Sequence, residues 1–109
     1  MDDNAVEESL QAKGLNAPRL TPALIDAAIK AEAYYVFPGT LLTVCCLTLQ
    51  NGFNVVGESA SVSVNNFDAE IGRKVSRAKA RDKIWALEGY LLKQYLSTLP
   101  AHFSEPKPT

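Results

Sequence analysis

The sequence predicts an α+β fold in which a short N-terminal helix, a β-hairpin and a long C-terminal helix follow one another. Three observations support this expectation. Thr21-Pro22 begins a stretch with helical spacing, two apolar runs flank Asn51-Gly52, and a long amphipathic segment follows Asn66. With 109 residues, the chain has the length of one small domain.

The first helix is expected over residues 22–35. Threonine at position 21 can cap a helix, and proline at the first helical position sacrifices no hydrogen bond. The apolar residues that follow recur with helical spacing and stop before Pro38: Leu24, Ile25, Ala28, Ile29, Ala31 and Ala33. Pro38-Gly39 then has the composition of a turn.

A β-hairpin is expected next, because residues 40–49 are rich in apolar and β-branched side chains. Asn51-Gly52 is typical of a type I′ turn, in which both central residues have positive φ. The returning strand is predicted over residues 53–64, with Gly57 as a candidate bulge.

The long helix is expected over residues 67–97. Asn66 is the candidate N-cap, and Asp68 and Glu70 in the first turn suit the helix dipole. These elements make residues 21–98 a single α-β-β-α domain. Residues 1–20 are expected to form a weakly ordered acidic lead with room for one helical turn, and residues 99–109 a loose proline-rich tail.

Composition excludes several functional classes. Eleven basic and twelve acidic residues leave a net charge of -1, so no global field attracts nucleic acid or an anionic membrane. No apolar run reaches the length of about 18 residues that a membrane span needs. The acidic start of the chain lacks the features of a secretory signal. We therefore expect a cytoplasmic protein that has no membrane contact.

Cysteine and histidine usage argues against a metal, a cofactor and an enzyme. Cys45 and Cys46 point to opposite faces of the expected strand, so they are poorly placed to form a disulfide bond with each other. Two thiols cannot complete a four-ligand metal site without histidines, and His102 lies in the tail. The usual general base is missing from the folded part, and the chain contains no phosphate-binding loop motif.

The chain carries more apolar surface than a hairpin and one short helix can bury. The second half of the long helix is apolar over more than half its circumference, and both faces of the first hairpin strand are apolar. Gly89 in mid-helix suggests the close approach of another helix. This excess favours a homo-oligomer, with a close-packed monomer and an ordered lead as the alternative.

A basic block is the strongest local signal for binding. Arg73, Arg77 and Arg81 recur every fourth residue and so form one ridge along the long helix. Arginine binds phosphate through two parallel hydrogen bonds, which suits a phosphodiester ligand. The alternative is a solvated helix face that keeps an oligomer soluble.

Aromatic and small polar residues lie near the expected chain turns. Tyr34 and Tyr35 close the first helix, where a ring can stack on a base, although one of the two can instead belong to the core. Short polar side chains near the hairpin ends can form hydrogen bonds with the edge of a nucleobase, or merely stabilise the turns: Asn51, Ser59, Ser61, Asn65 and Asn66.

Six blocks of the chain, in order, closely resemble one family of small tailed-phage proteins, the anti-CBASS protein 2 sponges. The blocks are residues 34–40, 42–45, 51–53, 56–60, 66–72 and 84–92. The resemblance implies a homohexamer that sequesters the cyclic oligonucleotide messengers of a bacterial immune system without degrading them. Its partners would be further copies of itself and cyclic dinucleotides or trinucleotides, such as cyclic GMP-AMP, in the cytoplasm of the infected host.

The resemblance also implies binding residues. The family's dinucleotide pocket, which lies between protomers, uses a tyrosine at the end of the first helix, here Tyr35 or Tyr34. It also uses a lysine before the hairpin turn, where this chain has Gln50, which keeps a hydrogen bond but loses the charge. The separate trinucleotide pocket uses a basic residue late in the long helix, for which Lys93 is the nearest match.

Two other functions stay open from the residues alone. The apolar arc around Trp85 could dock a host protein, or the basic ridge could bind linear nucleic acid. The near-neutral net charge makes nucleic-acid binding the weaker of the two.

Overall fold

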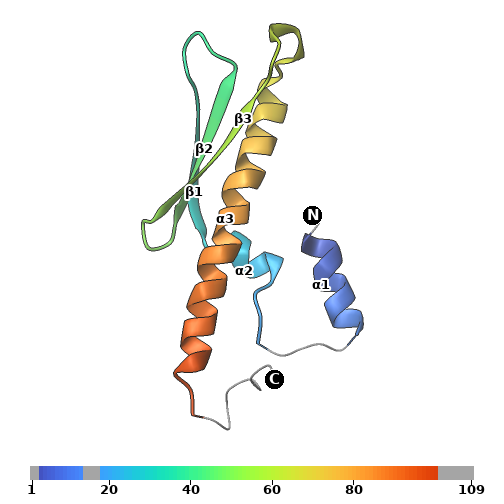
Figure 1. The fold of residues 1–109 in the computed structure, drawn as a ribbon, viewed down its shortest axis with the longest axis vertical. Coiled ribbons are helices and arrows are strands. Elements are labelled where there is room, and N and C mark those ends of the chain that lie inside the picture. Colours follow the sequence, from blue (N-terminus) through green and yellow to red (C-terminus); the bar gives the residue numbers. More distant parts are fainter. Residues whose placement is uncertain (1–2, 14–17, 101–109) are drawn as a thin grey trace.

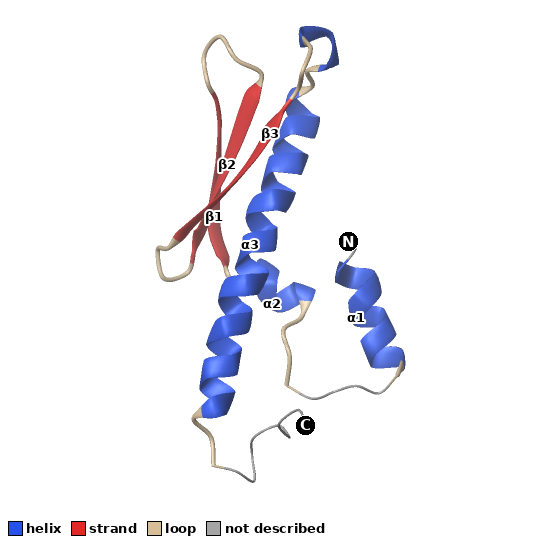
Figure 2. Cartoon of the chain, viewed as in Figure 1, coloured by secondary structure: helices blue, strands red, loops and turns tan. Residues whose placement is uncertain are grey.

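The computed structural model describes residues 3–13 and 18–100. Three antiparallel strands form one sheet, and a long helix crosses one face of it (Figures 1 and 2). The elements in chain order are α1 (Asp3–Ala12), α2 (Pro22–Ala27), β1 (Ile29–Val36), β2 (Leu42–Leu49), β3 (Asn54–Ala60), the 3₁₀ turn η1 (Val64–Asn66) and α3 (Ala69–Ser97). The predicted α+β class is confirmed.

The expected first helix is wrong beyond residue 27. Thr21 caps α2 as predicted, since its Oγ1 accepts a hydrogen bond from the Leu24 N–H at 3.2 Å. After Ala28, however, the chain becomes strand β1, which pairs with β2 from Ile29↔Leu49 to Val36↔Thr43. Helix formers in this segment produced the helical pattern, and pairing with a neighbouring strand overrides that propensity. The predicted two-stranded hairpin is therefore a three-stranded sheet.

Two short turns join the strands. Gly39 and Gly52 have φ of 76° and 90°, and the described chain contains no other residue with positive φ. Asn51 therefore does not adopt the type I′ geometry expected of it. Instead the Gly52 N–H donates to the Leu49 carbonyl at 2.9 Å, and Gly52 completes a three-residue loop. The returning strand β3 ends at Ala60, four residues before the expected limit.

Helix α3 begins two residues later than expected. Asp68, rather than Asn66, is its N-cap, with Oδ1 accepting from the Ile71 N–H at 3.0 Å. Asn66 instead ends η1. The predicted end of the helix at Ser97 is confirmed.

The segment before residue 21 has more structure than the one helical turn expected, because Asp3–Ala12 forms α1. Of the predicted tail, only residues 99 and 100 lie within the described chain.

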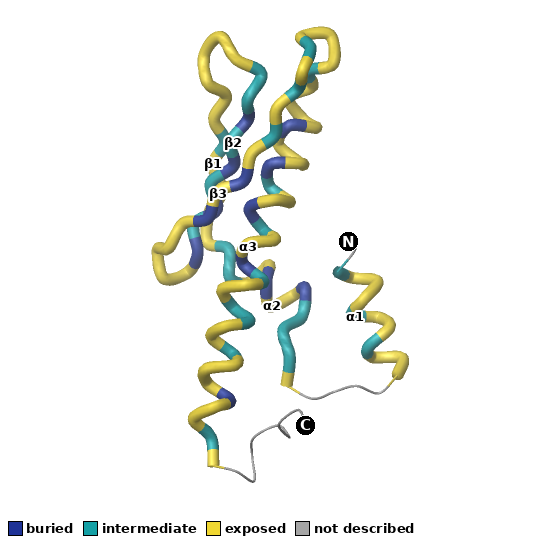
Figure 3. The backbone as a smooth tube through the Cα atoms, in the orientation of Figure 1, coloured by how far each residue is buried: buried dark blue, intermediate teal, exposed yellow. Residues whose placement is uncertain are grey.

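Helix α3 rests on the sheet through a line of mostly small residues spaced by four, which are all buried: Gly72, Ser76, Ala80 and Ile84 (Figure 3). They face Gly57 on β3 and the buried side chains of β2. Gly57 is not a bulge, because β2 and β3 pair without interruption from Leu42↔Ala60 to Thr48↔Asn54. It is instead the place where helix and sheet backbones touch. The bulge lies in β1, between Ile29 and Ala31.

The hydrophobic core lies between α2, the sheet and α3. Its fully buried members include Ile25, Leu47 and Ile84, one from each layer. On the opposite face of the sheet Tyr35, Val44 and Glu58 align across the three strands, and no described helix covers them (Figure 1). The sheet therefore has one packed face and one bare face.

Replacing Gly57 by alanine is predicted to destabilise the fold by about 1–3 kcal/mol, the usual cost of overpacking a close contact. The added Cβ would overlap the Ser76 carbonyl oxygen and the Ala80 nitrogen, and backbone atoms cannot rotate away. Denaturant unfolding followed by circular dichroism measures the change in the free energy of unfolding.

Gly89→Ala is the matched control. A Cβ there meets only Leu20 Cδ1 at 3.9 Å, so alanine should stabilise α3 by up to about 1 kcal/mol. Equal effects of the two substitutions would contradict the assigned contact at Gly57.

Candidate functional site

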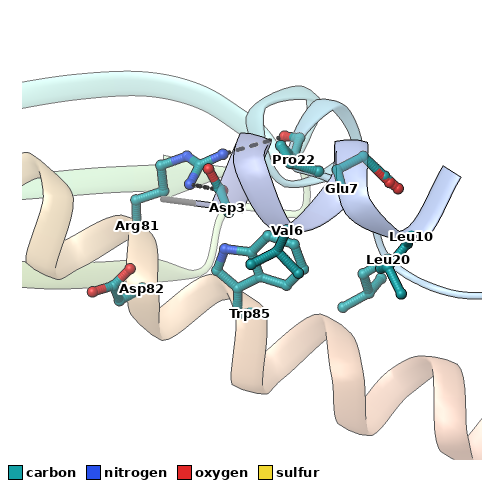
Figure 4. Close-up of a pocket in the computed structure, with 9 residues that line it drawn as sticks. All are labelled: Asp3, Val6, Glu7, Leu10, Leu20, Pro22, Arg81, Asp82 and Trp85. Carbon is teal, nitrogen blue, oxygen red and sulfur yellow. Dashed lines mark hydrogen bonds and ion pairs between the residues drawn. The ribbon is translucent and has the colours of Figure 1, made fainter. Parts of the chain in front are cut away.

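A cavity of about 430 Å³ lies between α1, the segment before α2 and the middle of α3 (Figure 4). Its volume is within the range of about 300–1,000 Å³ that is usual for small-molecule sites. The lining residues come from three segments of the chain: Asp3, Val6, Glu7 and Leu10; Leu20 and Pro22; Arg81, Asp82 and Trp85.

Helix α1 forms one wall of this cavity with a single face. Asp3, Val6, Glu7 and Leu10 are spaced by three and four residues, which places them on one side of a helix. This helical spacing is visible in the sequence. It did not predict a helix of this length, because the segment over residues 1–20 is polar and short. None of the residues of α1 is buried, so the helix bridges a hollow rather than packing tightly.

Arg81 joins the three helices around the cavity. Its Nη1 lies 2.5 Å from Oδ2 of Asp3 on α1, and its Nε lies 2.8 Å from Oδ1 of Asp26 on α2. Nη2 donates to the Pro22 carbonyl at 3.3 Å. Burial lowers the pKa of Arg81, but hydrogen bonds with Asp26 and Asp3 outweigh it and raise the pKa above its ordinary value. One guanidinium thus holds two carboxylates.

A second ion pair fixes the middle of α1. Arg19 donates from both Nε and Nη2 to the Glu7 carboxylate, with the shortest distance 2.6 Å. Both side chains are mostly buried. Charged contacts at its first residue and in its middle therefore hold α1 over the cavity.

Trp85 provides the aromatic surface of the cavity. It lies four residues after Arg81, so the two side chains project from the same face of α3. Figure 4 shows the indole beneath Val6, with the Arg81 guanidinium toward Pro22. A cation next to an aromatic ring can hold a phosphate and an adjoining base.

The arginine ridge also reaches the sheet. Arg77 Nε donates to Glu32 Oε2 on β1 at 2.7 Å, and the Tyr34 hydroxyl donates to Glu32 Oε1 at 3.3 Å. The hydrogen bond from Arg77 lowers the pKa of Glu32. Two residues predicted for the site, Tyr34 and Arg77, are thus brought together through a carboxylate that the sequence did not single out.

Tyr34 and Tyr35 occupy opposite faces of the sheet. Tyr34 packs against the core, and burial raises its pKa to about 12. Tyr35 is 55% exposed on the bare face and contacts Phe37 edge to face, with ring centroids 4.9 Å apart. Of these two residues, Tyr35 is therefore the one that can reach a ligand or a second copy of the chain.

Gln50 and Asn51 line another cavity, of about 390 Å³, between α2, the β2–β3 turn and α3. Gln50 Nε2 donates to the Ala27 carbonyl at 3.2 Å, and its backbone N–H donates to the Ala28 carbonyl at 3.0 Å. Gln50 therefore ties the turn to the end of α2 while its side chain lies at the cavity.

The remaining predicted residues lie apart from these cavities. Ser59 lines a small hollow of about 30 Å³, together with Ser61 and Asn66. Arg73 and Lys93 are exposed on α3, and Asn65 is exposed in η1. The structure thus distributes the predicted site residues over several places rather than one.

No group of three or more potential metal ligands occurs among residues 3–13 and 18–100. No helix in the same ranges has the length and apolarity to cross a membrane. His102, the single histidine, falls outside the described residues. Hydrogen-bonding, ionic and stacking groups are what these cavities offer a ligand.

A protein-family model, described as "Phage protein (N4 Gp49/phage Sf6 gene 66) family", matches residues 20–96. The matched range runs from Leu20 to the last turn of α3, and α1 lies before it. No curated protein and no solved structure matches the chain.

Stability should depend on the protonation of Glu32. Because its pKa is lowered from 4.5 in the folded state, its contribution is present above pH 4.5 and disappears as the pH falls through the folded value. Glu32→Gln should cost about 0.2–1 kcal/mol at pH 7, as exposed ion pairs do, and progressively less below pH 4.5.

Urea unfolding at several pH values between 3 and 7 measures this difference between the two proteins. Glu70→Gln is the control, since Glu70 forms an exposed pair with Lys74 on the same helix. A cost of Glu32→Gln that stays constant down to pH 3 would argue against the Arg77 pair.

Proposed function

The chain belongs to the phage protein family whose model covers residues 20–96, and on that premise we propose that it sequesters cyclic oligonucleotide messengers. In this proposal it binds cyclic dinucleotides such as cyclic GMP-AMP, and cyclic trinucleotides, in the cytoplasm of the infected bacterium. Binding without cleavage starves the effector of the CBASS immune system. The resemblance of six sequence blocks to the anti-CBASS protein 2 sponges supports this assignment.

The pairing of Arg81 with Trp85 in one cavity is the observation that carries the proposal. A guanidinium can take a phosphodiester bidentately, and a base stacked on an aromatic ring gains about 1–3 kcal/mol. An incoming phosphodiester would replace the Asp3 carboxylate at Nη1 and leave Asp26 on Nε. This exchange preserves the charge around Arg81.

The proposal treats the protein as a binder rather than an enzyme. Glu32, next to Arg77, is held as a carboxylate of lowered pKa and is therefore a weak base. Burial raises the pKa values of Tyr34 and Cys45, which keeps both groups protonated at neutral pH. None of these three side chains is therefore suited to remove a proton from a ligand.

Self-association completes the proposal. Large apolar side chains are exposed along the second half of α3: Leu87, Tyr90, Leu91 and Tyr95. Such a surface on a small chain is typical of an interface between copies. We propose a homo-oligomer, a hexamer by resemblance, in which Tyr35 on the bare sheet face stacks on a ligand held between protomers.

Replacing Arg81 by lysine should weaken binding of cyclic GMP-AMP about tenfold, since lysine keeps the charge but lacks the planar fork. Trp85→Leu should weaken it by a similar factor, because leucine fills space but cannot stack. Isothermal titration calorimetry measures the affinities.

Lys74→Met is the control, because Lys74 is exposed and pairs with Glu70 one helical turn away. Chromatography of the heated complex should return intact ligand. Linear products would contradict sequestration, and unchanged affinities would place the ligand away from this cavity.

The same exposed face of α3 favours a second candidate, a protein that docks a host protein. Light scattering of the purified chain distinguishes the two. A stable hexamer at micromolar concentration is expected, and a monomer that binds no cyclic oligonucleotide would favour docking. Linear nucleic-acid binding through the ridge is the weakest candidate, because the net charge of the chain is -1.

A further inference from the structure

The cavity beside Gln50 and Asn51 adjoins the cavity beside Trp85. Leu20 lines both and separates them. A Cβ added at Gly89 would lie 3.9 Å from Leu20 Cδ1, so Leu20 lies over α3 at this level. The two hollows are therefore neighbours along one helix, and a ligand with two ends can enter both.

The second cavity combines aliphatic walls with one carboxylate. Leu24, Ala28 and Leu49 supply apolar surface, and Glu88 is the single charged residue in its lining. Glu88 is half-buried, and among residues 3–13 and 18–100 no ion pair or hydrogen bond of its side chain is found. An ionised carboxylate only accepts hydrogen bonds, so this cavity offers acceptors to a ligand that carries donors.

The two amides at the rim are already engaged. Gln50 Nε2 donates to the Ala27 carbonyl, and Asn51 Oδ1 accepts from the Phe53 N–H at 2.9 Å. Gln50 cannot turn its amide donors toward Glu88 without breaking its contact with the end of α2, whereas the Asn51 contact uses only the amide oxygen. A ligand that carries donors can therefore pair with Glu88 without displacing either contact.

We propose that this cavity binds a nucleobase and selects guanine through Glu88, an inference that rests on the proposed function. Guanine presents two adjacent N–H donors, N1–H and the N2 amino group, which match the two oxygens of one carboxylate. Adenine would direct its N1 acceptor at the same oxygens. Leu24 and Leu49 provide the apolar surface for the faces of the base.

The positions on α3 fit one ligand that spans both cavities. Arg81, Trp85 and Glu88 are spaced by four and three residues and so share a face of the helix. Seven residues of α-helix rise about 10 Å. A nucleotide with its phosphate at Arg81 would thus direct a base toward Glu88, past Leu20.

The test is the affinity of the full chain for cyclic di-GMP and for cyclic di-AMP, measured by calorimetry. The wild type should prefer cyclic di-GMP by about tenfold or more, the range of one bidentate base contact. Glu88→Gln should remove that preference and leave the affinity for cyclic di-AMP within about twofold, because an amide cannot accept both hydrogen bonds. Glu70→Gln is the matched control on the same helix and should change neither affinity.

Equal affinity of the wild type for both ligands, or an equal loss for both in Glu88→Gln, would overturn the inference and leave sequestration standing. If cyclic GMP-AMP, cyclic di-GMP and cyclic di-AMP all fail to bind, the proposed function fails for cyclic dinucleotides, and guanosine and adenosine monophosphates then test the cavity directly. Chemical-shift changes at the Leu24 and Asn51 amides with the guanosine nucleotide alone support the inference. Their absence overturns it.

Discussion

The contact of α3 with β3 determines where every other functional side chain lies. Gly72, Ser76 and Ala80 have little or no side chain, and Gly57 opposite them has none, so the helix rests on the sheet with backbone against backbone. Each residue that follows this buried line by one position turns about 100° around the helix axis. Arg73, Arg77 and Arg81 follow it in this way and form the ridge. Two of them reach the carboxylates of β1, α2 and α1.

The arginine ridge has two consequences for binding. Its ion pairs assemble α1, α2, β1 and α3 around Arg77 and Arg81, and they also supply carboxylates that an anionic ligand can replace. The exchange is easiest at Asp3, because α1 has no buried residue and is held mainly by charge. Asp26 and Glu32 lie on elements that pack against the rest of the fold. In the proposed function, the guanidinium of Arg81 holds α1 and α2 together in the free protein and would bind a phosphate in the complex.

Local signals in the sequence were sufficient for part of the fold. Thr21-Pro22 marks the start of α2, and the two glycine turns and the long helix are recognisable because caps and turns depend on neighbours in the chain. Strand β1 could not be found in this way, since residues 29–36 carry helix formers and become a strand only when β2 lies beside them. The spacing of the arginines predicted their common ridge. Their partners, and the cavity at Trp85, depend on α1 and β1, whose positions no local pattern specifies.

The order of the strands, β1-β2-β3, bears on how fast the chain can reach its native state. Each strand pairs only with its sequence neighbours, across short loops. The sheet can therefore form through two successive hairpins, and a hairpin forms in about 1–10 μs. Docking of α3 brings together partners such as Gly57 and Ala80 that are far apart in sequence. Contacts of high sequence separation slow folding. The rate-limiting step of folding should therefore be the docking of α3 on a sheet whose strands are already paired.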